Sequence, residues 1–154
     1  MGPVITTGYL LTHTASIVLR QSDQMLQERL GIGMSQFKLL LMLQKSPNVQ
    51  QRTLAERLGQ TEASISRQIK LLCEKGLLTV RVNPKSRREH ITVPTTKGIK
   101  ITEAAVEVLG EYNTPMLEKL SEKQRQQMAE ALTVFHEHIC SPGKPFACDH
   151  SYEL

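Results

Sequence analysis

The chain has 154 residues and a formal net charge of +4, and 40% of its residues are hydrophobic, 4% are aromatic and none is Trp. This length and composition fit one globular domain with its own core and exclude a disordered chain, and the odd number of cysteines (3) argues against a disulfide framework. No apolar run approaches the ~20 residues of a membrane span and no signal peptide is recognisable, so we expect a soluble, cytoplasmic protein with no membrane partner.

The first third of the chain predicts two helices. Residues 5–30 carry apolar side chains at helical spacing without an internal proline, which predicts one long helix that ends near Gly31. Ser35 is the expected N-cap of a second helix, which the sequence Ser46-Pro47-Asn48 ends.

Two shorter helices follow, joined by a tight turn. The sequence Thr53-Leu54-Ala55-Glu56 has the form of a capping box, so we expect a helix that begins at Thr53 and stops at Gly59. Thr61 is a suitable N-cap for the next helix, which we expect to run to Gly76. A turn of this length is typical of helix-turn-helix units.

The second of these helices has two distinct sides. At 100° per residue, Ile65, Ile69 and Leu72 form one buried stripe. The opposite side and its flanks carry small, hydroxyl and basic side chains, and the candidate DNA contacts are Thr61, Ala63, Ser64, Ser66, Arg67 and Lys70. Such a face can enter the major groove and bond to base edges and phosphates. The alternative is an ordinary exposed helix face.

A β-hairpin with a basic tip is expected after this helix. From Leu78 to Val93 the apolar residues alternate, and the two strands flank a turn that contains Lys85, Arg87 and Arg88. These three side chains are candidate contacts to phosphates or to a minor groove, and a solvated basic turn is the alternative. Residues 50–98 carry ten Lys and Arg against four Asp and Glu, whereas the rest of the chain has a net charge of −2.

The last third returns to helical spacing. A helix is expected from about residue 97, and Pro115 should bend or restart it. The capping box Ser121-Glu122-Lys123-Gln124 opens a final helix, which ends near residue 140. Residues 141–154 contain two prolines and a glycine, and we expect a flexible tail there.

These motifs together carry a family resemblance. The runs Thr53–Gly59, Ser64–Leu72, Glu74–Leu78, Ser86–Arg88 and Thr95–Gly98 resemble the winged helix-turn-helix of MarR-family transcription regulators, and the likeness covers residues 5–140 in order and spacing. It implies a single, mostly α domain (1–154) with a small β-hairpin wing. The DNA-binding region would span residues 35–96, and terminal dimerisation helices would span 5–30 and 97–140.

The resemblance also implies a function. Such a protein is a homodimer that binds a near-palindromic operator in double-stranded DNA, here most simply as a repressor associated with the nucleoid. It implies a small-molecule effector in a cleft between the dimerisation helices and the DNA-binding region. The candidate residues for that cleft are Tyr9, His13, Arg20 and Phe37. Buried packing is the alternative role for each of them.

Histidine and cysteine gather near the C-terminus. His136 and Cys140 are four residues apart on one helix face, and Cys148 and His150 follow the Pro-Gly turn. Four such ligands would suit zinc or copper. Reversible thiol chemistry at Cys140 and Cys148, or a plain solvated helix end, are the alternatives, and DNA binding itself requires no cofactor.

The two alternatives to a DNA-binding regulator are a protein-interaction module and an enzyme. A winged helix can serve as a protein-interaction or dimerisation module without binding DNA, and that reading predicts no salt-sensitive affinity for DNA. An enzyme is not expected, because the sequence has no phosphate-binding glycine loop, nucleophile elbow or constellation of acidic residues and histidine.

Overall fold

The computed structural model describes residues 2–47, 49–83 and 86–140. In these ranges the chain forms six helices and one two-stranded antiparallel sheet. In chain order the elements are α1 (Pro3–Leu30), α2 (Met34–Lys45), α3 (Gln51–Leu58), α4 (Glu62–Glu74), β1 (Leu78–Asn83), β2 (Ser86–Pro94), α5 (Thr96–Leu117) and α6 (Glu122–Ile139). This is the mostly α fold with a β-hairpin wing that the sequence predicts.

Several of the expected helix ends are confirmed by their capping groups. Helix α1 ends at Gly31, whose φ of 67° lies in the left-handed region that favours glycine. Helix α4 begins after Thr61, whose side chain accepts a hydrogen bond from the Ser64 amide. Helix α6 begins with the capping box formed by Ser121 and Gln124.

The expected starts of α2 and α3 lie two and three residues too late. Gly33, not Ser35, precedes α2, because the Asp23 carboxylate accepts from the Met34 amide at 2.7 Å and caps this helix from α1. A side chain at position 33 would collide with that carboxylate, since a Cβ there would lie 2.9 Å from Asp23 Oδ1.

Helix α3 begins at Gln51, so Thr53 lies inside it. The Glu56 carboxylate accepts from Arg52 Nε at 3.1 Å, one turn earlier on the same helix, and does not form the expected capping box. Pro115 likewise does not restart a helix: α5 continues to Leu117, and Pro115, which has no amide to donate to the preceding turn, lies two residues before the helix ends.

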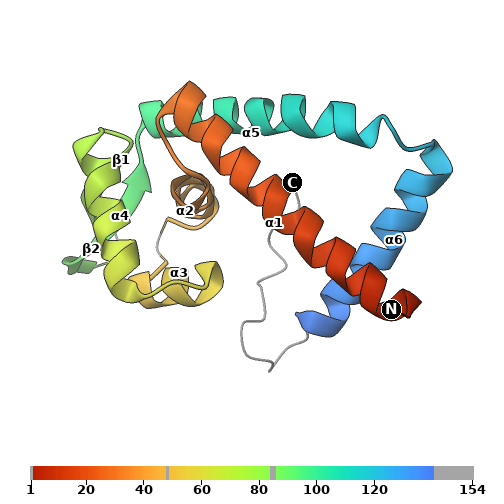
Figure 1. Ribbon diagram of the computed structural model, residues 1–154. Coiled ribbons are helices and arrows are strands. Elements are labelled where there is room, and N and C mark those ends of the chain that lie inside the picture. The colour runs from red at the N-terminus through yellow and green to blue at the C-terminus, as the bar shows by residue number, and fades with distance from the viewer. Residues whose placement is uncertain (1, 48, 84–85, 141–154) are drawn as a thin grey trace.

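The hydrophobic core lies at one end of the molecule, where α2, α3, α4 and the hairpin meet the facing ends of α1 and α5 (Figure 1). Each element contributes side chains at its own period, so the core is one continuous cluster. It consists of Leu26, Ile32, Phe37, Leu39, Leu40, Met42, Leu43, Leu54, Ala55, Ile65, Ile69, Leu72, Leu77, Leu78, Ala105 and Val108.

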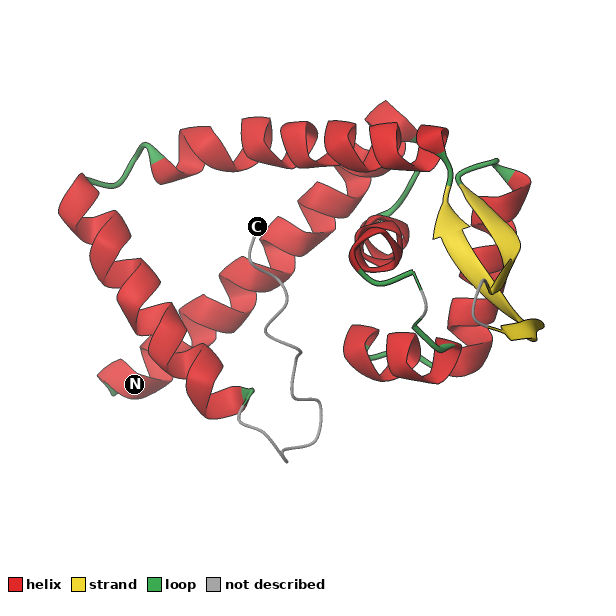
Figure 2. Ribbon diagram, turned by 180° about the vertical axis from the view of Figure 1, so that it is seen from behind, coloured by secondary structure: helices red, strands yellow, loops and turns green. Residues whose placement is uncertain are grey.

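The three longest helices form an open triangle beside this core, which Figure 2 shows from behind. Helix α1 is joined to α5 by an ion pair of 2.5 Å between Arg29 and Glu111 and by a hydrogen bond from the Tyr112 hydroxyl to Gln21. Helix α6 crosses the N-terminal end of α1 (Figure 2) and has no buried residue. No helix in the described residues is long and apolar enough to span a bilayer.

Candidate nucleic-acid interface

Helices α3 and α4 form the helix-turn-helix. Gly59 ends α3 with a φ of 62°, and Thr61 opens α4 two residues later. The Thr61 hydroxyl accepts from the Ser64 amide at 3.1 Å, which satisfies one of the free amides of the first turn. The short turn therefore fixes α4 firmly against α3.

The two sides of α4 have opposite environments. Ile65, Ile69 and Leu72 are 0%, 7% and 0% exposed and anchor the helix in the core, as the sequence predicts. The other side is open to solvent and presents Ala63, Ser66, Arg67, Lys70 and Glu74. Neither Arg67 nor Lys70 forms an ion pair with another described residue, so both cations are free to meet a phosphate or a base.

Ser64 differs from the other candidate contacts on α4. It is half-buried, and its hydroxyl donates to Gln60 Oε1 at 3.1 Å. Gln68 donates to the same Gln60 oxygen at 2.6 Å, and Gln60 itself donates to Ser35 Oγ at 3.2 Å. Sequence reasoning missed Gln60 and Gln68. Gln68 follows Ser64 by four residues on α4, the spacing at which helical side chains meet, whereas Gln60 lies in the turn, where no such period applies.

The C-terminal end of α4 is tied to the two long helices of the triangle. Lys75 Nζ donates to the carbonyl oxygen of Gly31 at the end of α1, at 2.6 Å. Lys97 Nζ donates to the Lys75 carbonyl at 3.0 Å, and Thr95 Oγ1 donates to that of Gly76 at 2.7 Å. The orientation of α4 is thus set by α1 and α5 as well as by α3.

The hairpin that follows α4 is the wing. Strands β1 and β2 pair antiparallel from Leu78 opposite Pro94 to Val82 opposite His90, and the register shifts before Asn83 pairs with Ser86. The backbones of Arg87 and Arg88 lie in the shifted part of β2, next to the tip. Lys85 and the side chains of residues 86–90 lie outside the described part of the chain, so these three contacts stay predictions.

The four candidate effector residues are not brought together. Tyr9 and His13 stack on the exposed surface of α1 with ring centroids 5.2 Å apart, and Arg20 is exposed on the same helix. Phe37, in contrast, is 5% exposed and belongs to the core. Only the first three residues can meet a ligand at one surface.

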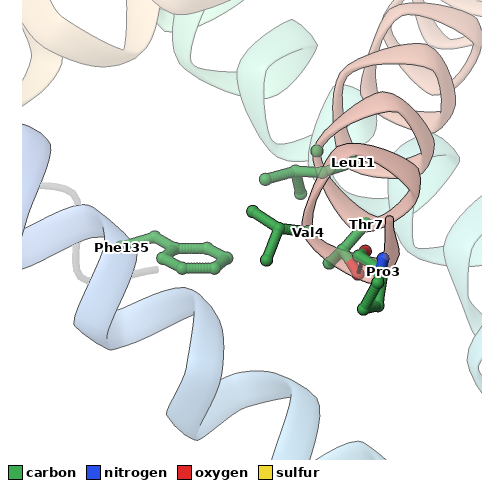
Figure 3. A pocket seen from close by; sticks show the side chains of 6 residues that line it. Pro3, Val4, Thr7, Leu11 and Phe135 are labelled. Carbon is green, nitrogen blue, oxygen red and sulfur yellow. Dashed lines mark hydrogen bonds between the residues drawn. The ribbon is translucent and has the colours of Figure 1, made fainter. Parts of the chain in front are cut away.

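An apolar surface lies where α6 meets the N-terminal end of α1, away from the hydrophobic core. A hollow of about 410 Å³ is lined by Pro3, Val4, Thr7, Gly8 and Leu11 of α1 and by Phe135 of α6. Figure 3 shows the Phe135 ring facing Val4 and Leu11 across this space. The side chains around it are unusually open, with Val4 84% and Ile139 61% exposed. An apolar surface of this kind indicates a binding partner.

The expected metal site is only partly within the described residues. His136 and Cys140 lie one helical turn apart at the end of α6, whereas Cys148 and His150 fall outside the described part. Among the described residues, no three His, Cys, Asp or Glu side chains gather as a metal site would require. Cys73 is half-buried at the end of α4, and burial, with a smaller effect of Glu74, raises the pKa of its thiol.

Comparison with known proteins places this geometry in context. Residues 30–89 match the sequence model of the MarR family. The HTH-type transcriptional regulator BilQ of Clostridium symbiosum is 28% identical over 98 residues, which cover 64% of this chain and 68% of BilQ. MepR, a transcription regulator of the Staphylococcus aureus multidrug efflux pump MepA, superposes with a TM-score of 0.70 at 26% identity, covering 85% of this chain and 96% of MepR. A MepR mutant bound to an oligodeoxyribonucleotide superposes with a TM-score of 0.59 at 27% identity, covering 86% of this chain and 96% of the mutant.

Proposed function

We propose that this chain binds a specific operator in double-stranded DNA, because it belongs to the MarR family of winged helix-turn-helix transcription regulators. The observation that carries the proposal is the exposed side of α4, where Ser66, Arg67 and Lys70 lie opposite the buried stripe with no packing role. The outer turns of such a helix are narrow enough to enter a major groove. The basic wing beside it adds charge for the neighbouring phosphates.

The test is a binding titration against salt. DNA fragments enriched from the source genome by the purified protein are compared with random fragments of the same length. An operator-binding protein prefers the enriched fragments, and its affinity falls steeply as salt rises because phosphate contacts release counterions. A winged helix that serves only protein interaction shows neither behaviour, and that result would reject the proposal.

The uncovered apolar surface of α1 and α6 supports a homodimer. Val4, Ile5, Leu10, Val134 and Ile139 are each more than half exposed, which a stable single chain rarely tolerates over adjoining helices. A second copy would cover these side chains and carry a second α4. Two copies related by a two-fold axis match a near-palindromic operator, and a dimer seated over a promoter excludes RNA polymerase, so we propose repression.

An effector site on α1 is part of the same proposal. Tyr9, His13 and Arg20 lie within ~40° of one another around the axis of α1, with Arg20 ~10 Å further along it than His13, so an elongated aromatic anion could stack on the rings and pair with the guanidinium. Oxidation of Cys140 and Cys148, or a zinc or copper ion held by His136, Cys140, Cys148 and His150, is a second way to modulate the protein. A zinc titration of the full chain with and without Cys148→Ser tests the metal. An unchanged number of zinc ions bound per chain would reject the metal site.

We place the protein in the cytoplasm, on the chromosome.

A further inference from the structure

Four polar side chains form one hydrogen-bonded series at the turn of the helix-turn-helix. Gln60, in the turn, donates through Nε2 to Ser35 Oγ of α2 at 3.2 Å. Its Oε1 faces α4 and accepts from Ser64 Oγ at 3.1 Å and from Gln68 Nε2 at 2.6 Å. Gln60, Ser64 and Gln68 are all half-buried, so water competes weakly for the bonds among these three, whereas Ser35 is exposed. The contacts proposed above do not use Gln60.

The direction of these bonds fixes the chemistry of Ser64. An amide has one accepting and one donating end, and the donation from Gln60 to Ser35 leaves the oxygen turned toward α4. A serine hydroxyl has a single proton, and Ser64 gives its proton to that oxygen. What Ser64 retains is lone pairs, of which one meets Gln68 Nε2 at the long distance of 3.4 Å. Toward any further partner, Ser64 can therefore only accept.

The amide of Gln68 supports the same direction. Its Oε1 is buried and has no hydrogen-bond partner within the described structure. Turning the amide over would place an NH2 group with two protons in that position and take the donor away from Gln60 Oε1. Buried carbonyl oxygens without a partner are more common than buried orphan N–H groups, so the observed orientation is the favoured one.

We propose that Gln60 sets the base preference of the protein without touching DNA, by holding Ser64 as a pure hydrogen-bond acceptor. In the major groove, adenine N6 and cytosine N4 are donors, whereas guanine and thymine offer acceptors at the corresponding positions. Ser64 then selects an amino-bearing base on the strand that it faces. Gln60 acts as a positioning residue, and the proposal rests on the DNA-binding function proposed above.

The test is a selection from a random DNA library, carried out with the full-length wild-type chain and five variants. Ser64→Ala removes the contact, and Gln60→Met removes the acceptor at nearly constant volume. Gln60→Glu keeps two accepting oxygens, Gln60→Lys can only donate to Ser64, and Ser35→Ala removes only the bond on the far side of Gln60. The quantity compared is the ratio between the frequencies of the four bases at one position of the selected sites. A change in charge that alters the affinity for all sequences by the same factor leaves this ratio unchanged. Circular dichroism and thermal unfolding establish that each variant is folded.

For the wild type we expect a preference of about fivefold for adenine or cytosine over guanine or thymine at one position of each half-site, the value of one net hydrogen bond. Ser64→Ala and Gln60→Met should reduce it to below about twofold, whereas Gln60→Glu should retain it. Ser35→Ala should also retain it, because Gln68 still donates to the Gln60 oxygen and holds it toward α4. Gln60→Lys frees the Ser64 proton and should shift the preference toward guanine or thymine. This shift keeps the test decisive if Gln60→Met does not fold.

Two results distinguish a failure of the proposed role of Gln60 from a failure of the proposed DNA-binding function. If the wild type enriches no sequence, the proposed DNA-binding function itself is wrong. If the wild type enriches a site and folded Ser64→Ala or Gln60→Met keeps the same preference, the operator function stands and the role of Gln60 is overturned. A loss of preference in Gln60→Glu, with Ser64→Ala also losing it, overturns the direction of the hydrogen bonds.

Discussion

Gly98 lies where the first turn of α5 crosses the backbone that enters β1. A Cβ at this position would be 2.1 Å from the carbonyl oxygen of Leu77, and backbone cannot yield as a flexible side chain can. The Gly98 amide also donates to Thr95 Oγ1 at 3.0 Å, and its carbonyl accepts from buried Thr102 at 2.8 Å. The contact between α5 and the base of the wing thus depends on one missing methyl group.

Gly98→Ala should lower the free energy of unfolding by about 2–4 kcal/mol, because the clash must be relieved by moving α5 away from Leu77. The matched control is Gly110→Ala in the same helix, where a Cβ meets nothing within 4 Å. That control should gain up to about 1 kcal/mol from helix propensity. Urea unfolding of both variants measures the difference, and equal stabilities would contradict the close approach.

Arg67→Ala and Arg88→Ala should weaken DNA binding in different ways. Loss of Arg67 from the exposed side of α4 should weaken the free energy of binding to the operator by about 1–3 kcal/mol. It should also alter the preferred sequence. Loss of Arg88 near the wing tip should weaken binding to all DNA sequences by the same factor. It should also reduce the slope of log affinity against log salt concentration by about one. Fluorescence anisotropy with operator and random DNA separates the two effects. Arg125→Ala, on α6, is the control that should bind like the wild type, and wild-type binding by both test variants would disprove the interface.

The thiol of Cys73 should react slowly in the folded protein. Burial, and to a smaller extent Glu74, raises the pKa of this thiol, so less thiolate is present near pH 8 than for a free cysteine. Alkylation of Cys73 by iodoacetamide, followed by peptide mass spectrometry, should speed up when the protein is unfolded in urea. A rate at Cys73 equal to that of a free thiol in the native protein would contradict the burial of this side chain.

At the scale of the elements, the sequence predicted correctly those features that depend on residues close together in the chain. The stripe Ile65, Ile69 and Leu72 identified the buried side of α4, and alternation identified both strands of the wing. The start of α2 was missed because its cap, Asp23, comes from another helix. The bond between Gln60 and Ser35 was missed for the same reason, since 25 residues separate the two side chains.

Thr61 and Thr53 offer a direct comparison of a real and a false N-cap. Thr61→Ala removes the acceptor for the Ser64 amide and should cost about 1 kcal/mol of unfolding free energy. Thr53→Ala lies inside α3 and should change the stability by no more than about 0.5 kcal/mol. Thermal unfolding of the two variants decides between them. A larger loss for Thr53→Ala would restore the capping box that the sequence suggested.

At the scale of the whole molecule, the triangle of α1, α5 and α6 is incomplete as a folded body. Helix α6 has no buried residue, and the hollow between Phe135 and the first turns of α1 is open. Hydrophobic burial is the main force that holds helices together, and a single chain supplies little of it here. The uncovered parts of the triangle are consistent with the proposed second copy, whereas the ends of α1 and α5 that face the helix-turn-helix and the wing share one core with them.

Phe135→Glu should convert the proposed dimer into a monomer, because it places a charge in the apolar hollow beside Val4 and Leu11. Sedimentation velocity over a range of protein concentrations measures the change. Lys123→Gln, at an exposed position of the same helix, should leave the dimer intact. An unchanged mass for Phe135→Glu, or a wild type that is monomeric at all concentrations, would show that the surface serves another purpose.

The division of α4 into a packed side and an exposed side has an evolutionary consequence. Ala63, Ser66, Arg67 and Lys70 are exposed and lie outside the core, so under the proposed function substitutions there change the DNA sequence that is bound at almost no cost in stability. After a gene duplication, two copies of such a protein could drift apart onto separate target genes by a handful of changes on this one surface. The same property makes the exposed side of α4 a practical starting point for redirecting the protein to a chosen DNA sequence.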